Sequence, residues 1–272
     1  MVVAETGCAH HGSVDELICM IEATARAGAD AVKFQVRRPD FETDDTEQFR
    51  PGCETIQDET RAAYWRRHAL PLKDWKVATA AAKDLGLVVG ASVFSPEGVD
   101  WCVQLGVDYL KIGSGHVLDS DLESVAVHAG APVVFSEGIN KVHFGSFLNC
   151  HGLKLQCQSI YPTPHSLCRL YLEDDYDGFS CHTGTIEPVV DALSNGAQMV
   201  EVHVCYSKDQ TGPDTSSSVT FEQLTQICRH RDFIREASNW TPDKEAQAAA
   251  LIDQTRQAIR TGKRFNTQEK AE

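Results

Sequence analysis

The sequence predicts a single-domain (β/α)₈ barrel, a TIM barrel, spanning residues 1–272. Eight short apolar runs rich in β-branched residues alternate with helical or irregular chain, a pattern typical of parallel strands buried on both faces. The length is close to the roughly 250 residues that eight such units need. No Gly-x-Gly-x-x-Gly motif follows the first run and no Walker A motif is present, which disfavours an open nucleotide-binding sheet.

The first two expected strands, 2–7 and 31–36, flank a well-marked helix. Ser13 with a glutamate three residues later forms a capping-box pattern, apolar residues follow at helical spacing, and Gly28 provides a stop. A polar segment at 37–70 comes next. Because connections in compact domains are usually shorter, we expect a functional or mobile loop there.

The rest of the chain continues the alternation. A helical, charged tail from about 221 to 265 is expected to close the barrel, with 235–272 as a C-terminal helical tail. Helices are expected near 71–86, 96–105, 119–128 and 186–195. The remaining strands are expected at 87–92, 107–112, 132–136, 153–158, 178–182 and 198–204.

Composition excludes several classes of protein. Lys and Arg number 25 against 39 Asp and Glu, a net charge of −14, which disfavours nucleic-acid and anionic-membrane partners. An anionic ligand must therefore bind in a local pocket. With no long apolar run and no signal-peptide pattern, we expect a soluble cytoplasmic protein. The ten cysteines form no Cys-x-x-Cys pair, so most are expected to be buried apolar residues in a reducing compartment.

Polar side chains gather where the expected strands end, and in a barrel those ends form the active site. Two lysines beside several hydroxyls suit a phosphate together with a carboxylate. Either lysine alone could instead extend to solvent along the strand end. The strand-end residues are Glu5, Lys33, Gln35, Ser92, Lys111, Ser114, Ser136, Ser159, Tyr161, Ser180, His182, Glu201 and His203.

Two histidines, His182 and His203, end consecutive expected strands. Neighbouring strand ends are about 5 Å apart, so both imidazoles could bind one divalent metal and leave positions open for water and substrate. The alternative for each is a hydrogen-bonded core histidine. His10 and His11 follow the first strand and are either substrate-binding or metal-proximal groups, or else plain solvated loop residues.

Several of these strings, in this order along the chain, resemble those of the N-acetylneuraminate (sialic acid) synthase family. The resemblance covers about residues 1–235. The matching strings are Ala4-Glu5-Thr6-Gly7 with His10 and Gly12, Ala27-Gly28-Ala29-Asp30-Ala31-Val32-Lys33-Phe34-Gln35, Lys111-Ile112-Gly113-Ser114-Gly115, Tyr161-Pro162-Thr163-Pro164, Ser180-Cys181-His182-Thr183 and Gly212-Pro213-Asp214.

The resemblance implies a transferase of nonulosonic acid biosynthesis that joins phosphoenolpyruvate to an amino-sugar aldose such as N-acetylmannosamine. It implies that His182 and His203 hold Mn²⁺ or Mg²⁺. Phosphoenolpyruvate would be held by Lys33, Ser92, Lys111, Ser114, Ser136 and Ser180. The acceptor and the reacting centre would be faced by Glu5, Gln35, Tyr161 and Asp214. Ser159 and His10 complete the expected substrate-binding set.

The sequence also departs from the family pattern, at His116, Glu137, Cys181 and Ser159. Family members usually carry an antifreeze-like C-terminal domain that completes the acceptor site in a swapped homodimer, and we expect the barrel alone here. A homodimer and a separate antifreeze-like protein are therefore the two partner hypotheses. Two functional alternatives stay open: a condensing enzyme for another aldose or a sugar phosphate, and a catalytically degenerate barrel that binds sugar or a partner.

Overall fold

The computed structural model describes residues 1–49, 53, 56, 58–138, 152–170 and 175–261. The chain divides into two compact units, Met1–Arg231 and Asp232–Glu272. The first unit contains the barrel and everything described below except the last helix.

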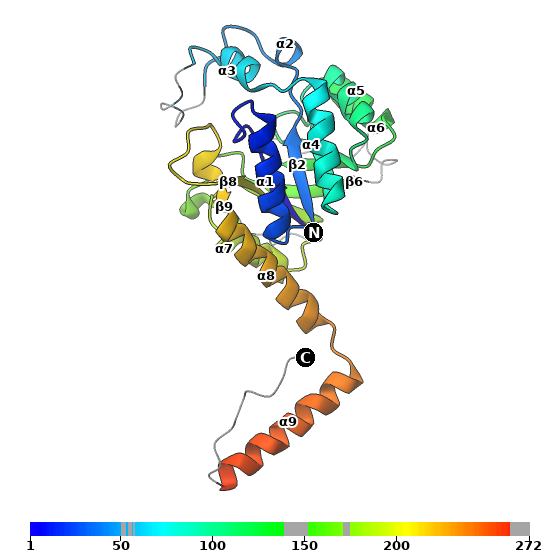
Figure 1. Ribbon diagram of the computed structural model, residues 1–272, viewed down its shortest axis with the longest axis vertical. Coiled ribbons are helices and arrows are strands. Elements are labelled where there is room, and N and C mark those ends of the chain that lie inside the picture. Colours follow the sequence, from blue (N-terminus) through cyan, green and yellow to red (C-terminus); the bar gives the residue numbers. More distant parts are fainter. Residues whose placement is uncertain (50–52, 54–55, 57, 139–151, 171–174, 262–272) are drawn as a thin grey trace. The chain divides into compact units, whose positions relative to one another are not determined.

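Eight parallel strands close into a barrel in the part of the chain that the structure describes. Consecutive strands are neighbours throughout, and β1 also pairs with β8, which closes the ring (Figure 1). The prediction of a (β/α)₈ barrel is therefore confirmed. The strands are β1 (Val2–Glu5), β2 (Ala31–Gln35), β3 (Val88–Ser92), β4 (Tyr109–Ile112), β5 (Val133–Glu137), β6 (Gly152–Cys157), β7 (Gly178–Cys181) and β8 (Met199–Cys205), with a short β9 (Val219–Thr220) beside β8.

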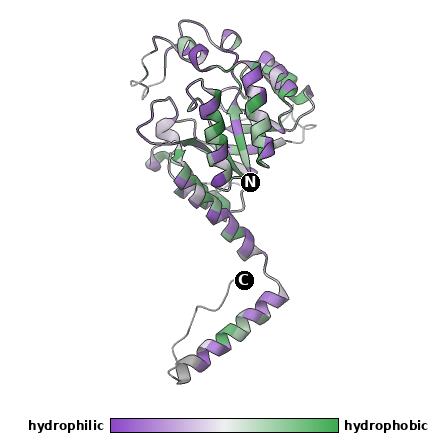
Figure 2. Cartoon of the chain, viewed as in Figure 1, coloured by the Kyte–Doolittle hydropathy of each residue, from purple (hydrophilic) through white to green (hydrophobic). Residues whose placement is uncertain are grey.

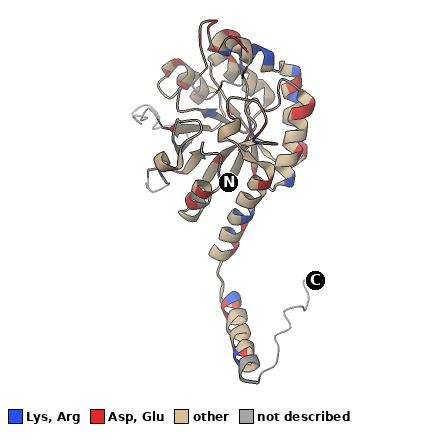
Figure 3. Cartoon of the chain, turned by 90° about the vertical axis from the view of Figure 1, so that its left-hand side faces the viewer, with Lys and Arg blue, Asp and Glu red and all other residues tan. Residues whose placement is uncertain are grey.

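The helices cover the outside of this ring, and charged residues of both signs lie along them (Figure 3). Ser13 caps the first helix as predicted, because its hydroxyl accepts from the Glu16 N–H at 3.2 Å. The helices of this unit are α1 (Val14–Arg26), α2 (Pro39–Glu42), α3 (Arg61–His68), α4 (Leu72–Asp84), α5 (Pro96–Leu105), α6 (Ser120–His128), α7 (Glu187–Ser194) and the first part of α8 (Phe221–Ser238), with single turns η1 (His165–Leu167) and η2 (Thr215–Ser217).

The described part of the expected loop at 37–70 contains two helices, α2 and α3, which its composition does not indicate. Thr60 caps α3, with its hydroxyl accepting from the Ala63 N–H at 3.2 Å. Tyr64 and Trp65 on that helix are buried despite the arginines around them. Because polar residues dominate the composition of this segment, its composition does not reveal the buried apolar face of α3.

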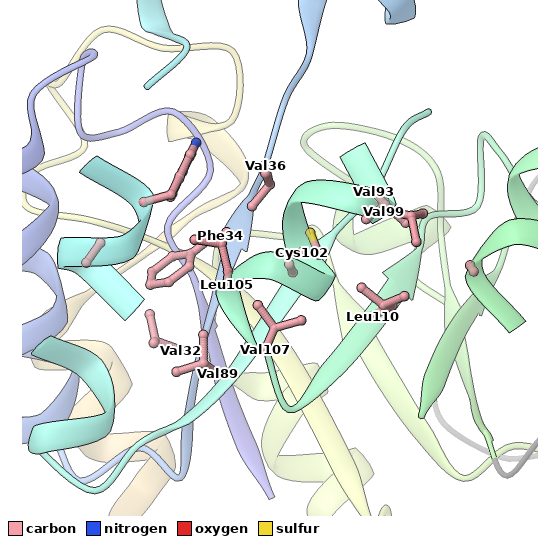
Figure 4. Packing of buried hydrophobic residues seen from close by; sticks show 14 of the residues in the cluster. Val32, Phe34, Val36, Val89, Val93, Val99, Cys102, Leu105, Val107 and Leu110 are labelled. Carbon is pink, nitrogen blue, oxygen red and sulfur yellow. The ribbon is translucent and has the colours of Figure 1, made fainter. Parts of the chain in front are cut away.

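Strand alternation separates two apolar layers. Outward-facing residues such as Val32, Phe34 and Leu110 pack under the helices (Figure 4). Inward-facing residues fill the barrel below the strand ends: Val3, Ala31, Tyr109, Val134, Leu155 and Met199. Gly90 makes room for the Tyr109 ring, since a Cβ there would lie 2.1 Å from Cζ of Tyr109. This packed layer is the floor on which a site at the strand ends rests.

The start of the C-terminal tail belongs to the barrel unit. Leu224 and Ile227 of α8 are buried, and Arg231 bonds Asp30 at 2.7 Å and the Gly28 carbonyl at 2.9 Å. Residues from 232 form the second unit, whose helix α9 (Pro242–Thr261) alternates polar and apolar residues (Figure 2). The end of the expected tail, 262–265, lies outside the described residues. No described helix is both long and apolar enough to cross a membrane.

Candidate active site

The strand ends surround a pocket of about 410 Å³ at one mouth of the barrel. Parallel register sets neighbouring side chains level: Glu5 pairs with Lys33 on one side and with His203 on the other. Alternation then points every second side chain inward. The lining residues are Glu5, Lys33, Gln35, Ser92, Phe94, Lys111, Gly113, Ser114, Ser136, Tyr161, Ser180, His182, Glu201 and His203.

Two glutamates and two lysines form a buried ion-pair network at the bottom of this pocket. Glu201 lies 2.9 Å from the Lys111 ammonium and 3.5 Å from that of Lys33. Lys33 also contacts the Glu5 carboxylate, which accepts from the Gly7 N–H at 2.8 Å. All four charged side chains are less than 5% exposed. Their formal charges cancel.

The hydroxyls beside this network serve it as donors and acceptors. Ser180 donates to Glu201 at 3.1 Å, and Ser92 accepts from Lys33 and donates to Glu5 at 3.4 Å. The lysines therefore do not extend to solvent. The alternative from the sequence, in which either lysine alone extends to solvent, is therefore wrong for both.

The network controls the charge states of its members. Burial acts to raise the pKa of Glu201, but the ammonium groups of Lys111 and Lys33 outweigh it and hold that pKa well below its usual range. Burial acts to lower the pKa of Lys33, but Glu201 and Glu5 outweigh it and raise the pKa. Burial and the neighbouring Lys33 lower the pKa of Lys111. Lys111 is thus the lysine whose charge depends most on its carboxylate partner.

His182 and His203 lie side by side, with ring centroids 5.7 Å apart. The His182 Nδ1 lies 2.7 Å from the Gln158 carbonyl oxygen, which can only accept, so Nδ1 carries the proton and the Nε2 lone pair is available. Burial, with a smaller effect of His203, lowers the pKa of His182 to about 3, so the ring is neutral. The Tyr161 ring packs against the His182 ring, with 4.0 Å between the two ring centroids. The Asp214 carboxylate oxygen Oδ2 lies 3.8 Å from Nδ1 of His203.

The two imidazoles offer nitrogen ligands, whereas Mn²⁺ and Mg²⁺ prefer oxygen ligands, so water and substrate oxygens would have to complete the coordination of either ion here. Among the described residues, no group of three or more His, Cys, Asp or Glu side chains is arranged to hold a metal ion. The metal assignment from the sequence stays a prediction.

Two polar atoms of the pocket residues are buried without a hydrogen-bond partner among the described residues. They are the Ser136 hydroxyl and the Gln35 amide oxygen. Buried polar atoms in native proteins are nearly always paired, and an unpaired one facing a pocket points to a ligand or water. Ser136 offers a proton and Gln35 offers an acceptor.

A second, wider chamber of about 1190 Å³ adjoins the pocket and shares Gln35, Phe94, Ser114, Tyr161 and His203 with it. Ser159 and Asp214 line this outer chamber rather than the inner pocket, and Ser159 hydrogen-bonds Ser114 at 2.6 Å. The outer chamber is also lined by Arg37, Phe49, Arg61, Trp65 and His116.

Gly7 lies close to the side chains of Asp214 and His203, which both line the outer chamber. Its φ of +53° is in the left-handed region, and a Cβ there would lie 3.4 Å from Asp214 and 3.6 Å from His203. A larger residue would be strained and would narrow the space between these side chains.

The structure brings together every sequence-predicted site residue except His10. His10 is 1% exposed, its Nδ1 accepts from the Gly12 N–H at 3.2 Å, and its ring packs edge-on to Trp75. The tight turn after β1 directs it into the core, so it does not line either chamber. The companion His11 has φ of +50° and hydrogen-bonds Gln210 at 2.9 Å.

Two departures from the family pattern have a simple place in the fold. Glu137 and Cys181 follow inward-facing Ser136 and Ser180, so alternation points both away from the pocket. Glu137 pairs with Lys154 at 3.0 Å, and Cys181 contacts Thr183 at 3.2 Å. His116 does line the outer chamber, edge-on to Phe94.

Sequence reasoning noted Glu201 at a strand end but did not assign it to the site, and it did not single out Arg37, Trp65 or Phe94. The spacing of Glu201 two residues before His203 on one strand was the available signal. The local sequence does not distinguish Arg37 from the neighbouring Arg38. The two arginines differ in the rings that they contact in the folded chain, which are Trp65 and Phe94 for Arg37.

Comparison with known proteins shows the family of this chain. The NeuB family model matches residues 20–241. N,N'-diacetyllegionaminic acid synthase of Legionella pneumophila is 27% identical over 277 residues, covering 92% of this chain and 78% of its own length. N-acetylneuraminate-9-phosphate synthase of Mus musculus is 25% identical over 252 residues, covering 87% and 70%.

Among solved structures, the N-acetylneuraminic acid (sialic acid) synthetase of Leptospira borgpetersenii in complex with citrate superposes with a TM-score of 0.74. It is 20% identical and covers 92% of this chain and 90% of that one, which supports the fold alone. Because the family model matches most of the chain, and its sequence relatives are sugar-acid synthases, the chain belongs to the NeuB family.

Proposed function

We propose that this chain condenses phosphoenolpyruvate with an amino-sugar aldose such as N-acetylmannosamine, giving a nonulosonic acid and phosphate. The observation that carries this proposal is the inner pocket. Two lysines and a Ser136 hydroxyl that has no hydrogen-bond partner among the described residues face one small space, which adjoins a larger chamber beside two histidines. An anion the size of phosphoenolpyruvate suits the inner space, and a sugar suits the outer one.

Phosphoenolpyruvate would be held by charge and by directed hydroxyls. Lys33 and Lys111 supply ammonium groups, and Ser136 donates the proton that has no other acceptor among the described residues. Ser92, Ser114 and Ser180 lie around them. Donors fixed in a buried site stabilise the charge that grows on a departing phosphate without having to reorganise.

The chemistry needs one carbon–carbon bond and one water. C3 of phosphoenolpyruvate bonds to the aldehyde carbon, and the aldehyde oxygen gains a proton to become a hydroxyl. C2 becomes an oxocarbenium centre, and water adds there with loss of one proton to leave a C2 hydroxyl. That hydroxyl then loses its proton as the C2–O bond to phosphate breaks, which leaves the ketone and releases phosphate. Glu5, oriented by the Gly7 N–H, is the carboxylate we assign to stabilise that cation or take the water proton.

The acceptor would lie against Gln35, Tyr161 and Asp214, which line the outer chamber. The unpaired Gln35 oxygen can accept from a sugar hydroxyl. His182 and His203 would hold the divalent metal, with Gln158 fixing the His182 tautomer as carbonyls commonly do at metal sites. When bound, Mn²⁺ or Mg²⁺ polarises the sugar aldehyde as a Lewis acid.

The test is to incubate the purified chain with phosphoenolpyruvate, Mn²⁺ and N-acetylmannosamine, and to measure phosphate and 2-keto acid together. In ¹⁸O-labelled water the phosphate should stay unlabelled, because the C2–O bond breaks, whereas a contaminating phosphatase would label it. Turnover only with phosphorylated aldoses would replace the acceptor assignment. Binding of phosphoenolpyruvate without turnover across an aldose panel would refute the proposal in favour of a degenerate barrel.

A further inference from the structure

Arg37 in the outer chamber is held in an aromatic clamp, which we define as Trp65 and Phe94. Its guanidinium carbon lies 3.8 Å from the Trp65 ring centroid and 3.7 Å from that of Phe94. All three residues line the chamber. Stacking on both faces fixes the guanidinium plane, so that only its edges can make hydrogen bonds.

The hydrogen-bond donors at the edge of the Arg37 guanidinium are only partly satisfied. Nη1 makes one long contact, 3.4 Å, to Glu42, and Nε is buried with no hydrogen-bond partner among the described residues. A buried donor without an acceptor is costly, and a ligand oxygen would relieve that cost. Glu42 already stands beside the cation, so charge balance does not require an anion. The missing partner is a neutral oxygen acceptor.

The surroundings of this donor are apolar. Trp65, Phe94, Phe49 and Pro213 line the same chamber. A group that offers a carbonyl oxygen next to a methyl therefore matches this wall better than a hydroxyl or a phosphate does. We propose that Arg37 is a specificity-determining residue that binds the acyl carbonyl of an N-acylated amino sugar, with the aromatic clamp fixing its orientation.

This inference rests on the proposed function, because it assigns the acyl group of the same acceptor. Its test compares Arg37→Met with Arg38→Met. Arg38 is a matched control, since it is the next residue, also lies over aromatic rings (Trp101 at 4.2 Å and Phe41 at 4.9 Å), and is not a lining residue of the chamber. Both variants remove one stacked cation.

Two readouts are measured for each protein: equilibrium binding of N-acetylmannosamine and mannose by ligand-observed NMR, and kcat/KM with both sugars. Wild type should prefer the acylated sugar, and Arg37→Met should lose that preference by roughly 10- to 100-fold, mainly through KM, as for loss of a hydrogen bond to a charged group. Mannose parameters and Arg38→Met should change little.

The outcomes separate this inference from the proposed function. Acyl-dependent binding that Arg37→Met abolishes, without phosphate release by wild type, supports the Arg37 role and refutes the synthase activity. Turnover by wild type with equal losses for both sugars in Arg37→Met refutes the Arg37 role alone. Absence of acylated-sugar binding by wild type at millimolar concentration also refutes it.

Discussion

Replacing Glu201 with Gln tests whether the buried network is one electrostatic unit. Glu201 is the carboxylate that contacts both lysines, at 2.9 Å for Lys111 and 3.5 Å for Lys33. The amide keeps the shape and one hydrogen-bond acceptor but removes the charge. Lys33 retains Glu5, whereas Lys111 is left with no anionic partner among the described ion pairs.

The size of the effect follows from this asymmetry. Breaking a buried ion pair so that one charge stays unpaired costs about 3 to 5 kcal/mol. Because the amide oxygen still accepts from Lys111, we expect the lower end, about 3 kcal/mol of unfolding free energy. For a domain of this size that is a fall in Tm of roughly 6 to 12 °C. Gln in place of exposed Glu22, which pairs with Arg26 at 3.4 Å, should cost less than about 1 kcal/mol.

The assay is thermal and urea unfolding of wild type, Glu201→Gln, Lys111→Met and the double variant. The double variant should lose less stability than the sum of the single variants, because removing the lysine removes the unpaired charge. An unfolding temperature of Glu201→Gln within about 1 °C of wild type, or strict additivity in the double variant, would show that these charges are solvated and that the network does not act as a unit.

Three further outcomes follow from the structure. Burial lowers the pKa of His10 from 6.5 to about 4, so the unfolded chain binds more protons at this residue. His10 should account for about 3 kcal/mol of the unfolding free energy that wild type loses between pH 6.5 and 4, in addition to the loss from other buried histidines such as His182; in pH-dependent urea unfolding, His10→Gln should lose less by about that amount. Gly90→Ala should lower Tm because its Cβ would overlap the Tyr109 ring, and Tyr109→Val should restore it in the double variant. His182→Ala should abolish Mn²⁺ binding seen by electron paramagnetic resonance together with turnover while circular dichroism stays unchanged; activity that survives in chelator would contradict the metal assignment.

The sequence predicts the barrel because each strand carries its own signal. Continuous apolar runs ended by polar residues, with a glycine stop such as Gly28, need no tertiary knowledge to be recognised. The segment 37–70 is different, because α3 is stabilised by burial of Tyr64 and Trp65 beneath a charged surface. Local composition reports the surface, so the helix is missed.

The site residues likewise fall into those that the sequence predicts and those that it does not. Strand-end residues are predictable because alternation and parallel register place them at one mouth, as for Lys33 and His203. Sequence reasoning places His10 in the site, whereas left-handed residues on both sides of it, Gly7 before and His11 and Gly12 after, turn the chain so that His10 is buried away from the pocket. The clamp around Arg37 is invisible in the sequence, since its two rings come from α3 and the segment after β3 and meet only in the folded chain.

Charge balance explains how an acidic chain can keep two lysines ready for an anion. Lysines that are 2 to 3% exposed would lose their protons or destabilise the fold if they stood alone. Glu201 and Glu5 raise the pKa of Lys33, and Glu201 opposes the burial that lowers the pKa of Lys111. In the proposed reaction, the phosphate group would meet lysine side chains that are already buried and oriented, and it would compete with carboxylates for them instead of recruiting them from solvent. The glutamates would therefore weaken ground-state binding of the anion, while they fix the positions of the lysines before the ligand binds.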